Sequence, residues 1–368
     1  MKKFLVFIIA VIYLQSVSAQ MDLPPSGGNA RAKITEEVGI TDITINYSRP
    51  DVNGREGKIW GGLITYGFTT QSFITNKNTA PWRAGANENT TITFEHDVKV
   101  EGKDLKAGTY GLFMAVWPEK VTIIFSNQSN AWGSFYYEDK YDALRVDVKP
   151  VALDKSVEYL KYEFIEQKDD NCTIALMWEK LMIPFKVNVD VRNIVVNRLR
   201  EQVTSQKGFN QLNLVAAVNY CLTNNVNLDE ALSWAQRASG FRSYTTLRTL
   251  AFTYEKLNRL KEADSVMTEA LTMANANQYG GYSRAMIVAK RFDKAVEVAL
   301  GAKTKFGEIP VVNSTLMFAY SAKGDFKNAL VYADKSMAQA TKDNNEAAKK
   351  GLEAQIAKLK EGKDINTF

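Results

Sequence analysis

An arginine and a glutamate five residues apart form the most unusual polar cluster of this sequence, in "APWRAGANENTTITF" from Ala80 to Phe94. Small and apolar residues surround Arg83, so we expect its guanidinium to be partly shielded from water. A shielded guanidinium needs a carboxylate or backbone carbonyls as partners, because an unpaired buried charge costs several kcal/mol. Glu88, Asp51 or Glu56 could supply that carboxylate.

Two interpretations of this cluster stay open. In the first, Arg83 and Glu88 hold a long loop against a β-domain and have a structural role only. In the second, Arg83, Asn87 and Glu88, together with Arg49 from another turn, form a ligand-binding pocket for an anion or a peptide carboxylate. The first interpretation predicts that Arg83→Ala strongly lowers stability, whereas the second predicts a loss of ligand affinity.

Residues that could carry catalysis are sparse elsewhere in the chain. His96 is the single histidine, and it lies in "FEHDV" among charged neighbours, where side chains usually face water. The sequence contains no GxSxG nucleophile elbow, no GxGxxG loop and no CxxC pair. We therefore predict no catalytic residue and no cofactor, and favour a protein that is not an enzyme.

Metal ligands are equally few. Two cysteines and one histidine cannot form a structural zinc site. The segment "YYEDKYD", Tyr136 to Asp142, gathers three carboxylates that could bind calcium, but it lacks the glycine and the alternating oxygen ligands of a calcium loop. We predict no metal.

Glycan binding or glycan hydrolysis is the alternative function for the β-rich half. Hydrolysis needs only two carboxylates across a cleft, and Glu88, Glu95 and Asp97 lie close together in the sequence. Tryptophan rings could stack on sugars, although most tryptophans in a β-rich chain belong to the core. The tryptophans concerned are Trp60, Trp82, Trp117 and Trp132.

The first residues predict export. Lys2 and Lys3 precede an apolar run of 11 residues, Phe4 to Leu14, and small residues follow up to Ala19. This pattern is typical of a signal peptide, residues 1–19, with cleavage after Ala19. The run is too short to span a membrane. We therefore expect a periplasmic protein, or an extracellular or outer-membrane-associated one, that does not span the membrane.

Charge and cysteine usage separate the two halves of the mature chain. Residues 20–190 carry a net charge of −5 and residues 191–368 a net charge of +8, with the basic side chains dispersed. Dispersed charge favours a solvated surface over a nucleic-acid site. Cys172 and Cys221 fall in different halves; a disulfide is open to them in an oxidising compartment, but we favour two separately buried thiols.

Residues 20–190 alternate apolar and polar side chains with a period of two. This pattern predicts about eight to ten short strands joined by turns, and hence an antiparallel β-sandwich or jelly-roll-like domain. Segments that carry the pattern are "DITINY", "TTITFE", "DALRVDVKP", "YLKYEFIE" and "CTIALMW".

Residues 191–368 have a helical period and contain a repeat. Leu228, Leu260, Phe292 and Phe326 recur at spacings of 32, 32 and 34 residues, each followed three residues later by alanine. Small residues at such positions let two helices approach closely. We predict an α-helical solenoid of four tetratricopeptide-like (TPR-like) hairpins, with a capping helix in "NNEAAKKGLEAQIAKLKEG". Such repeats commonly bind a protein or peptide on their concave face, although a structural or dimerisation role is the alternative.

The β-rich half carries a set of short motifs in a characteristic order. They are "YSRP", "GR", "IWG", "WRAGANE", "AGTY" and "WGS". In this order they resemble the DUF2911 family of exported bacterial proteins, over about Asp22 to Val189, and some members of that family carry a TPR-like tail. The resemblance implies an exported protein of unknown molecular function. One departure is a longer connection, residues 67–79.

Taken together, these patterns predict a non-catalytic binding or scaffolding factor of the bacterial envelope that uses its helical repeat to bind a polypeptide. Neither the partner nor the oligomeric state follows from the sequence.

Overall fold

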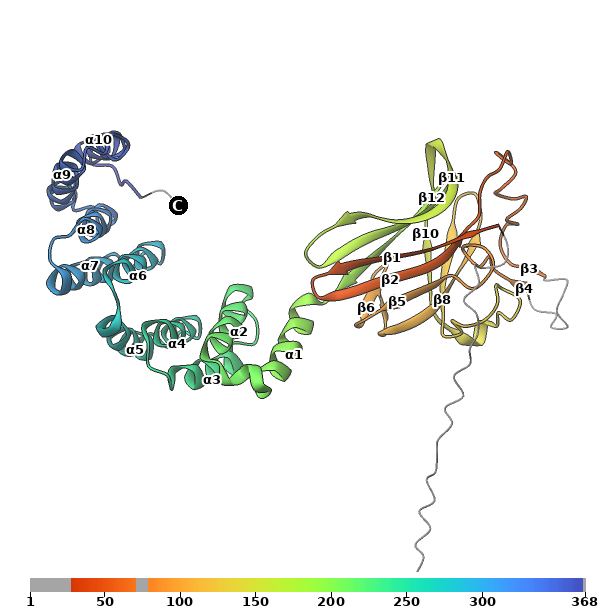
Figure 1. The fold of residues 1–368 in the computed structure, drawn as a ribbon, viewed down its shortest axis with the longest axis horizontal. Coiled ribbons are helices and arrows are strands. Elements are labelled where there is room, and N and C mark those ends of the chain that lie inside the picture. Colours follow the sequence, from red (N-terminus) through yellow and green to blue (C-terminus); the bar gives the residue numbers. More distant parts are fainter. Residues whose placement is uncertain (1–27, 71–78, 367–368) are drawn as a thin grey trace, which may run out of the picture. The chain divides into compact units, whose positions relative to one another are not determined.

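The structure is a computed structural model that describes residues 28–70 and 79–366. The chain divides into two compact units, with the division between Val195 and Val196. Figure 1 shows strands in the first unit and helices in the second. The expected signal peptide, residues 1–19, lies outside the described residues, as does most of the long connection at residues 67–79.

The first unit contains two larger antiparallel sheets and a short hairpin. One sheet has the strand order β1-β2-β5-β8-β9-β10, with β1 Ala30–Val38, β2 Thr41–Arg49, β5 Thr91–Phe94, β8 Gly108–Val116, β9 Val121–Ser126 and β10 Asp142–Val148. The other has the order β11-β12-β6-β7, with β11 Val151–Gln167, β12 Asn171–Val189, β6 Val98–Val100 and β7 Lys103–Leu105. The hairpin pairs β3 Thr69–Thr70 with β4 Thr79–Ala80.

The core of this unit lies between the two larger sheets. Alternate residues of β2, such as Ile43 and Ile45, are fully buried, as the period of two predicts. Phe125 of β9 and Phe185 of β12 come from opposite sheets and meet edge to face with ring centroids 6.1 Å apart. The predicted antiparallel β-sandwich is confirmed.

A second, smaller apolar cluster lies on the other face of β8 and β9. Phe113 and Ile124 pack there against Ala80 of β4 and Tyr137 of the loop before β10. Phe113 and Tyr137 make an edge-to-face contact with ring centroids 5.2 Å apart. Because β8 is buried on both faces, the loops that cover it are held firmly enough to position side chains.

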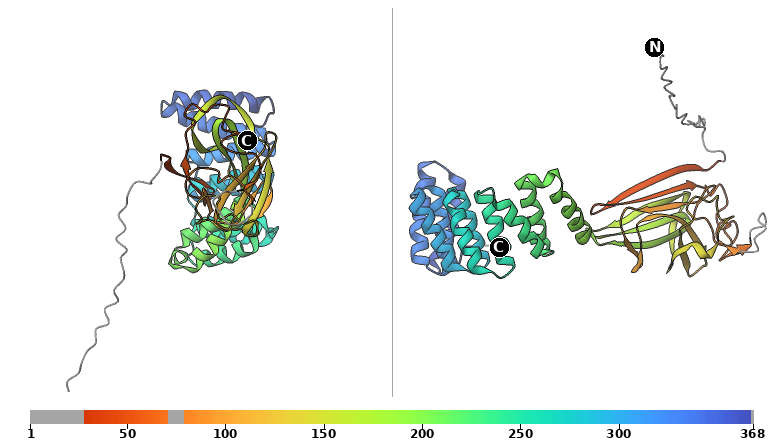
Figure 2. Two further views of the ribbon diagram at one scale, coloured as in Figure 1. Left: turned by 90° about the vertical axis from the view of Figure 1, so that its right-hand side faces the viewer. Right: turned by 90° about the horizontal axis from the view of Figure 1, so that it is seen from below.

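The second unit is a succession of antiparallel helices (Figure 2). Four hairpins pair α2 with α3, α4 with α5, α6 with α7, and α8 with α9. The helices of the described chain are α1 Val191–Thr204, α2 Gln211–Asn224, α3 Leu228–Ser239, α4 Tyr244–Lys256, α5 Leu260–Met273, α6 Ala276–Val288, α7 Phe292–Phe306, α8 Pro310–Lys323, α9 Phe326–Lys342 and α10 Glu346–Lys360. None of them is long and apolar enough to cross a membrane.

The repeat positions have the roles that their spacing predicts. The large residue of each repeat is the first residue of α3, α5, α7 or α9. The alanines three residues later are Ala231, Ala263, Ala295 and Ala329, with exposures of 0%, 1%, 0% and 0%. An alanine at the contact lets the two helices of a hairpin approach closely, so the TPR-like hairpins are confirmed.

The two cysteines are buried free thiols in different units, Cys172 in β12 and Cys221 in α2. Burial raises the pKa of the Cys172 thiol to about 12 and that of the Cys221 thiol to about 11. Each thiol therefore behaves as a small apolar core residue.

Candidate functional site

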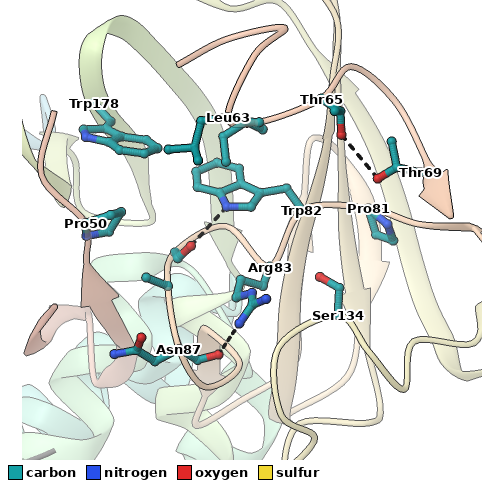
Figure 3. A pocket seen from close by; sticks show the side chains of 13 residues that line it. Pro50, Leu63, Thr65, Thr69, Pro81, Trp82, Arg83, Asn87, Ser134 and Trp178 are labelled. Atoms are coloured by element: carbon teal, nitrogen blue, oxygen red, sulfur yellow. Dashed lines mark hydrogen bonds between the residues drawn. The ribbon is translucent and has the colours of Figure 1, made fainter. Parts of the chain in front are cut away.

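The β unit contains a cavity of about 390 Å³ at the loop that follows β4 (Figure 3). Three chain segments and one strand form its wall. The long connection between β2 and β3 contributes Pro50 and Leu63. The loop after β4 contributes Trp82 and Arg83, and the loop before β10 contributes Ser134. Trp178 comes from β12 in the opposite sheet.

The loop after β4 is anchored at both ends of its turn. Trp82 pairs with Met114 of β8, with N–H to carbonyl distances of 3.0 and 2.8 Å. The carbonyl of Ala84 accepts hydrogen bonds from the hydroxyls of Thr90 and Tyr162, at 3.1 and 2.8 Å. These contacts fix the direction in which the side chains of the "WRAGANE" motif leave the backbone.

Glycine is required at one point of this turn. A Cβ at Gly85 would lie 2.5 Å from the Thr90 hydroxyl and 3.2 Å from the Ser48 carbonyl. The loop therefore lies tightly against the end of β2, which explains the glycine in the motif.

Arg83 is half-buried and is held by backbone and aromatic groups. Its Nη1 donates to the carbonyl of Asn87 at 2.5 Å, and its guanidinium carbon lies 5.2 Å from the ring centroid of Phe135. Gly133, with φ of +58°, lies against the same guanidinium. The "WRAGANE" and "WGS" motifs, fifty residues apart, therefore meet at one side chain. Burial lowers the pKa of Arg83.

The expected pairing of Arg83 with Glu88 or Asp51 is wrong. Glu88 instead forms an ion pair with Arg31 at 2.9 Å and accepts from the Ser48 hydroxyl at 3.2 Å. Asp51 pairs with Arg55 at 3.1 Å. Throughout the described residues, no carboxylate lies within ion-pair distance of Arg83, which uses a backbone carbonyl of its own loop as partner.

The four candidate binding residues lie in three different places. Arg83 and Asn87 line the cavity, whereas Glu88 lines a neighbouring hollow together with Arg31. Arg49 donates from Nε to the carbonyl of Leu160 at 3.0 Å and lies over the ring of Tyr159. Arg49 therefore ties β2 to β11, because its partners belong to that strand.

Tryptophan rings build the apolar wall of the cavity. Trp82 stacks with Trp178 at a centroid distance of 6.0 Å, and Trp60 meets both rings edge to face at 5.7 and 5.8 Å. The Trp82 indole N–H donates to the carbonyl of Gly85 at 3.0 Å, which fixes the ring. Trp178 and Ser134 were absent from the sequence-based candidates. The "WGS" motif was a usable signal for Ser134, whereas nothing in the sequence singled out Trp178.

The carboxylates considered for glycan hydrolysis do not converge on the cavity. Asp97 accepts from Lys106 Nζ at 2.7 Å, and Glu95 accepts from the backbone of Asp42 at 3.2 Å. His96 Nδ1 lies 3.1 Å from the Thr41 hydroxyl. Along the described wall of the cavity there is no Asp, Glu or His.

The acidic segment at residues 136–142 forms local pairs. Asp142 accepts from the Tyr137 hydroxyl at 2.7 Å and from Arg145 at 2.6 Å, while Glu138 pairs with Lys140. Among the described residues, no three His, Cys, Asp or Glu side chains are grouped to hold a metal.

The helical unit has a second candidate surface, where the chain after α10 turns back along α8 (Figure 1). The Ser321 hydroxyl donates to Asp364 at 2.7 Å and accepts from the N–H of Ile365 at 3.0 Å. Ile365 is 5% exposed and joins the helical core, and Asn366 donates to the carbonyl of Phe318 at 3.1 Å. A cavity of about 360 Å³ between α6 and α8 continues from this seat.

Comparison with known proteins adds the family of the first unit. No curated protein matches the chain. Solved structures similar to the helical half include the APC/C hetero-tetramer Cut9-Hcn1, with a TM-score of 0.29 and 14% identity over 46% of this chain and 36% of that chain. The chain therefore spans little more than a third of that structure. Another is YrrB, a TPR protein with an unusual peptide-binding site, with a TM-score of 0.27 and 13% identity over 44% of this chain and 92% of that chain.

The motifs that meet at Arg83 fall within the region that a family model covers. Residues 29–187 match the model DUF2911, described as "Protein of unknown function". The predicted resemblance to the DUF2911 family is therefore confirmed over residues 29–187, the β-rich region of this chain.

Proposed function

We propose that the protein is an exported, non-catalytic binding or scaffolding factor of the bacterial envelope, and that its helical repeat holds a polypeptide segment. The sequence-based export signal supports the location. The repeat supports the mode of binding, because stacked helical hairpins leave one row of helices free for a ligand.

The observation that carries this proposal is the way in which residues 364–366 bind along α8. There, a short stretch of chain outside any helix or strand is held by α8 through the N–H of Ile365, which donates to the Ser321 hydroxyl, through the side chain of Asn366, which donates to the carbonyl of Phe318, and through the buried side chain of Ile365. Backbone hydrogen bonds together with a pocket for one side chain are how many peptide-binding surfaces hold their ligands. The adjoining cavity between α6 and α8 offers room for a longer segment.

Catalysis has no comparable support. The described wall of the β-unit cavity holds one arginine and no acid, base or thiol. A glycan hydrolase would need two carboxylates across that cavity. We therefore assign binding rather than hydrolysis to the β unit as well.

The proposal can be tested by site-specific photo-crosslinking of the full chain in intact cells. A photo-crosslinking residue at Asn277 or Ser314, which line the cavity between α6 and α8, is expected to capture a discrete polypeptide. Thr268 on α5 is exposed and outside that cavity, so it serves as the matched control position. Equal adducts from all three positions, or none from the first two, would exclude a ligand on this surface.

The location can be tested separately by fractionation and N-terminal sequencing. The expected result is a mature chain that begins at Gln20 in the periplasmic or outer-membrane fraction. A chain that retains Met1 in the cytoplasm would contradict export without affecting the crosslinking result.

A further inference from the structure

Arg83 presents an incompletely satisfied cation to the β-unit cavity. A guanidinium has five N–H donors. Within the described chain, one hydrogen bond of this group is found, from Nη1 to the carbonyl of Asn87. The other donors and the charge are half-buried without an anion, which costs free energy. A negatively charged ligand would offset this cost. The charge of Arg83 therefore lies at a cavity whose described wall contains no carboxylate.

Ser134 supplies an independent observation at the same cavity. The residue is 3% exposed and lines the cavity, and its hydroxyl has no hydrogen-bond partner within the described ranges. The hydroxyl is therefore free to bond an atom of a ligand in the cavity, because a serine hydroxyl can donate one hydrogen bond and accept others. Gly133, the residue before it, contacts the guanidinium of Arg83, which places the two unsatisfied groups on the same side of the cavity.

The rest of the wall combines the polar side chains of Thr65, Thr69 and Asn87 with flat aromatic rings. Figure 3 shows the indole of Trp82 directed toward Leu63 and Trp178, whereas the guanidinium of Arg83 is directed toward the backbone of Asn87. The side-chain amide of Asn87 is directed away from Arg83 in the same view, so Asn87 positions the guanidinium through its carbonyl. The cavity thus has one charged end and one aromatic side.

We propose that this cavity binds a small organic anion with a single carboxylate, which pairs with Arg83 and Ser134 while a flat apolar body lies against Trp82. This site is separate from the helical surface of the proposed function, and neither requires the other.

Size and charge select this class of ligand. A cavity of about 390 Å³ has the size of small-molecule sites, which are mostly apolar with a few polar groups that orient the ligand. The described wall has one arginine and no lysine, so it matches one negative charge rather than the two of a phosphate group. A carboxylate also matches the planar arrangement of guanidinium donors.

Fluorine NMR can test the site with 4-fluorophenylacetate as the probe and the neutral 4-fluorophenylacetamide as its matched analogue. The carboxylate is expected to bind the full chain with a Kd of about 1 mM or below, and the amide at least about tenfold more weakly. This comparison uses the wild-type protein alone, so it does not depend on the folding of a variant.

Two variants locate the bound carboxylate. Ser134→Ala removes a hydroxyl that has no partner among the described residues, so it is expected to leave the unfolding temperature unchanged and to weaken binding about threefold to tenfold. Arg83→Gln keeps a donor for the Asn87 carbonyl but loses the charge, and is expected to weaken binding at least about tenfold. Arg55→Gln is the control, because Arg55 pairs with Asp51 outside the cavity.

Three results would overturn the proposal. These are equal affinity for carboxylate and amide, equal loss of binding in Arg55→Gln and Arg83→Gln, or no saturable binding of the carboxylate at about 10 mM. Inorganic phosphate serves as a further competitor. Displacement of the probe by phosphate at similar concentrations would contradict the requirement for an apolar body.

Discussion

The backbone of Gly133 lies so close to the side chain of Arg83 that a Cβ at Gly133 would come within 2.5 Å of the guanidinium carbon. This contact joins two loops that are distant in the sequence and forms one end of the cavity. Gly133 is thus required for two reasons, its positive φ of +58° and the space it leaves for the guanidinium.

Gly133→Ala is therefore expected to lower the free energy of unfolding by about 3 kcal/mol, from a strained backbone and a displaced Arg83. Gly57→Ala is the matched control, because Gly57 has φ of +67° and a Cβ there would meet no atom within 4 Å. The control should lose only about 1 kcal/mol. Urea unfolding measures both, and equal losses would show that the contact with Arg83 does not matter.

Arg291 connects two helical hairpins. It pairs with Glu255 of α4 at 3.3 Å and with Asp264 of α5 at 2.9 Å. The three side chains are only 23–38% exposed. Burial raises the pKa of Glu255, so that carboxylate depends on its partner. Arg291→Met is expected to cost about 1–2 kcal/mol of stability.

The control for Arg291 is Arg259→Met at the equivalent position of the preceding repeat. Arg259 pairs with Glu262 in a more exposed pair, at 45% and 46% exposure. Its loss should cost less than about 0.5 kcal/mol. Circular dichroism during urea unfolding distinguishes the two, and similar losses would rule out a special role for Arg291.

The buried thiols predict a pH effect of definite sign. The pKa of Cys172 is raised from 9.0 to about 12, and that of Cys221 to about 11. Their contribution to stability is therefore complete below pH 9.0 and declines as the pH rises from there through the folded pKa values, because the unfolded thiols ionise first.

Two measurements test the state of the thiols. Neither thiol should react with Ellman's reagent in the native protein at about pH 8, and both should react after unfolding. The double variant Cys172→Ala, Cys221→Ala should show a smaller fall in stability above about pH 9 than the parent protein. A protein that lacks titratable thiols even when unfolded would instead contain a disulfide.

Ser321→Ala should loosen the seat of the C-terminal segment. The hydroxyl serves both Asp364 and the N–H of Ile365, so its removal leaves a buried N–H without a partner. Amide hydrogen exchange at residues 364–366 is expected to accelerate about tenfold. Ser336→Ala is the control, since that hydroxyl bonds only to Tyr332 within its own helix. Unchanged exchange in the first variant would contradict this anchoring role.

Much of the fold could be predicted from local patterns. Strand alternation such as that of Ile43 and Ile45, and the recurrence of Ala231, Ala263, Ala295 and Ala329, encode the face that each element buries. The recurring large residues Leu228, Leu260, Phe292 and Phe326 were recognised by their spacing, and in the structure each begins the second helix of a hairpin.

The candidate site was only partly predictable. Arg83 and Asn87 were identified because their residue types are unusual within an apolar motif, and both line the cavity. The expected pair of Arg83 and Glu88 was wrong, because the turn with Ala84 and Asn87 at positive φ directs their side chains to different neighbours.

The sequence by itself determined the two kinds of secondary structure, the repeat and the family motifs, since these depend on periodicity and on residues close together in the chain. Only the tertiary structure decided which groups meet. Sheet pairing brought the Arg83 loop against β8, and the loop before β10 then placed Gly133 and Ser134 beside the guanidinium. Such contacts depend on strand order and on loop conformation, which no local pattern encodes, because they join residues thirty or more positions apart.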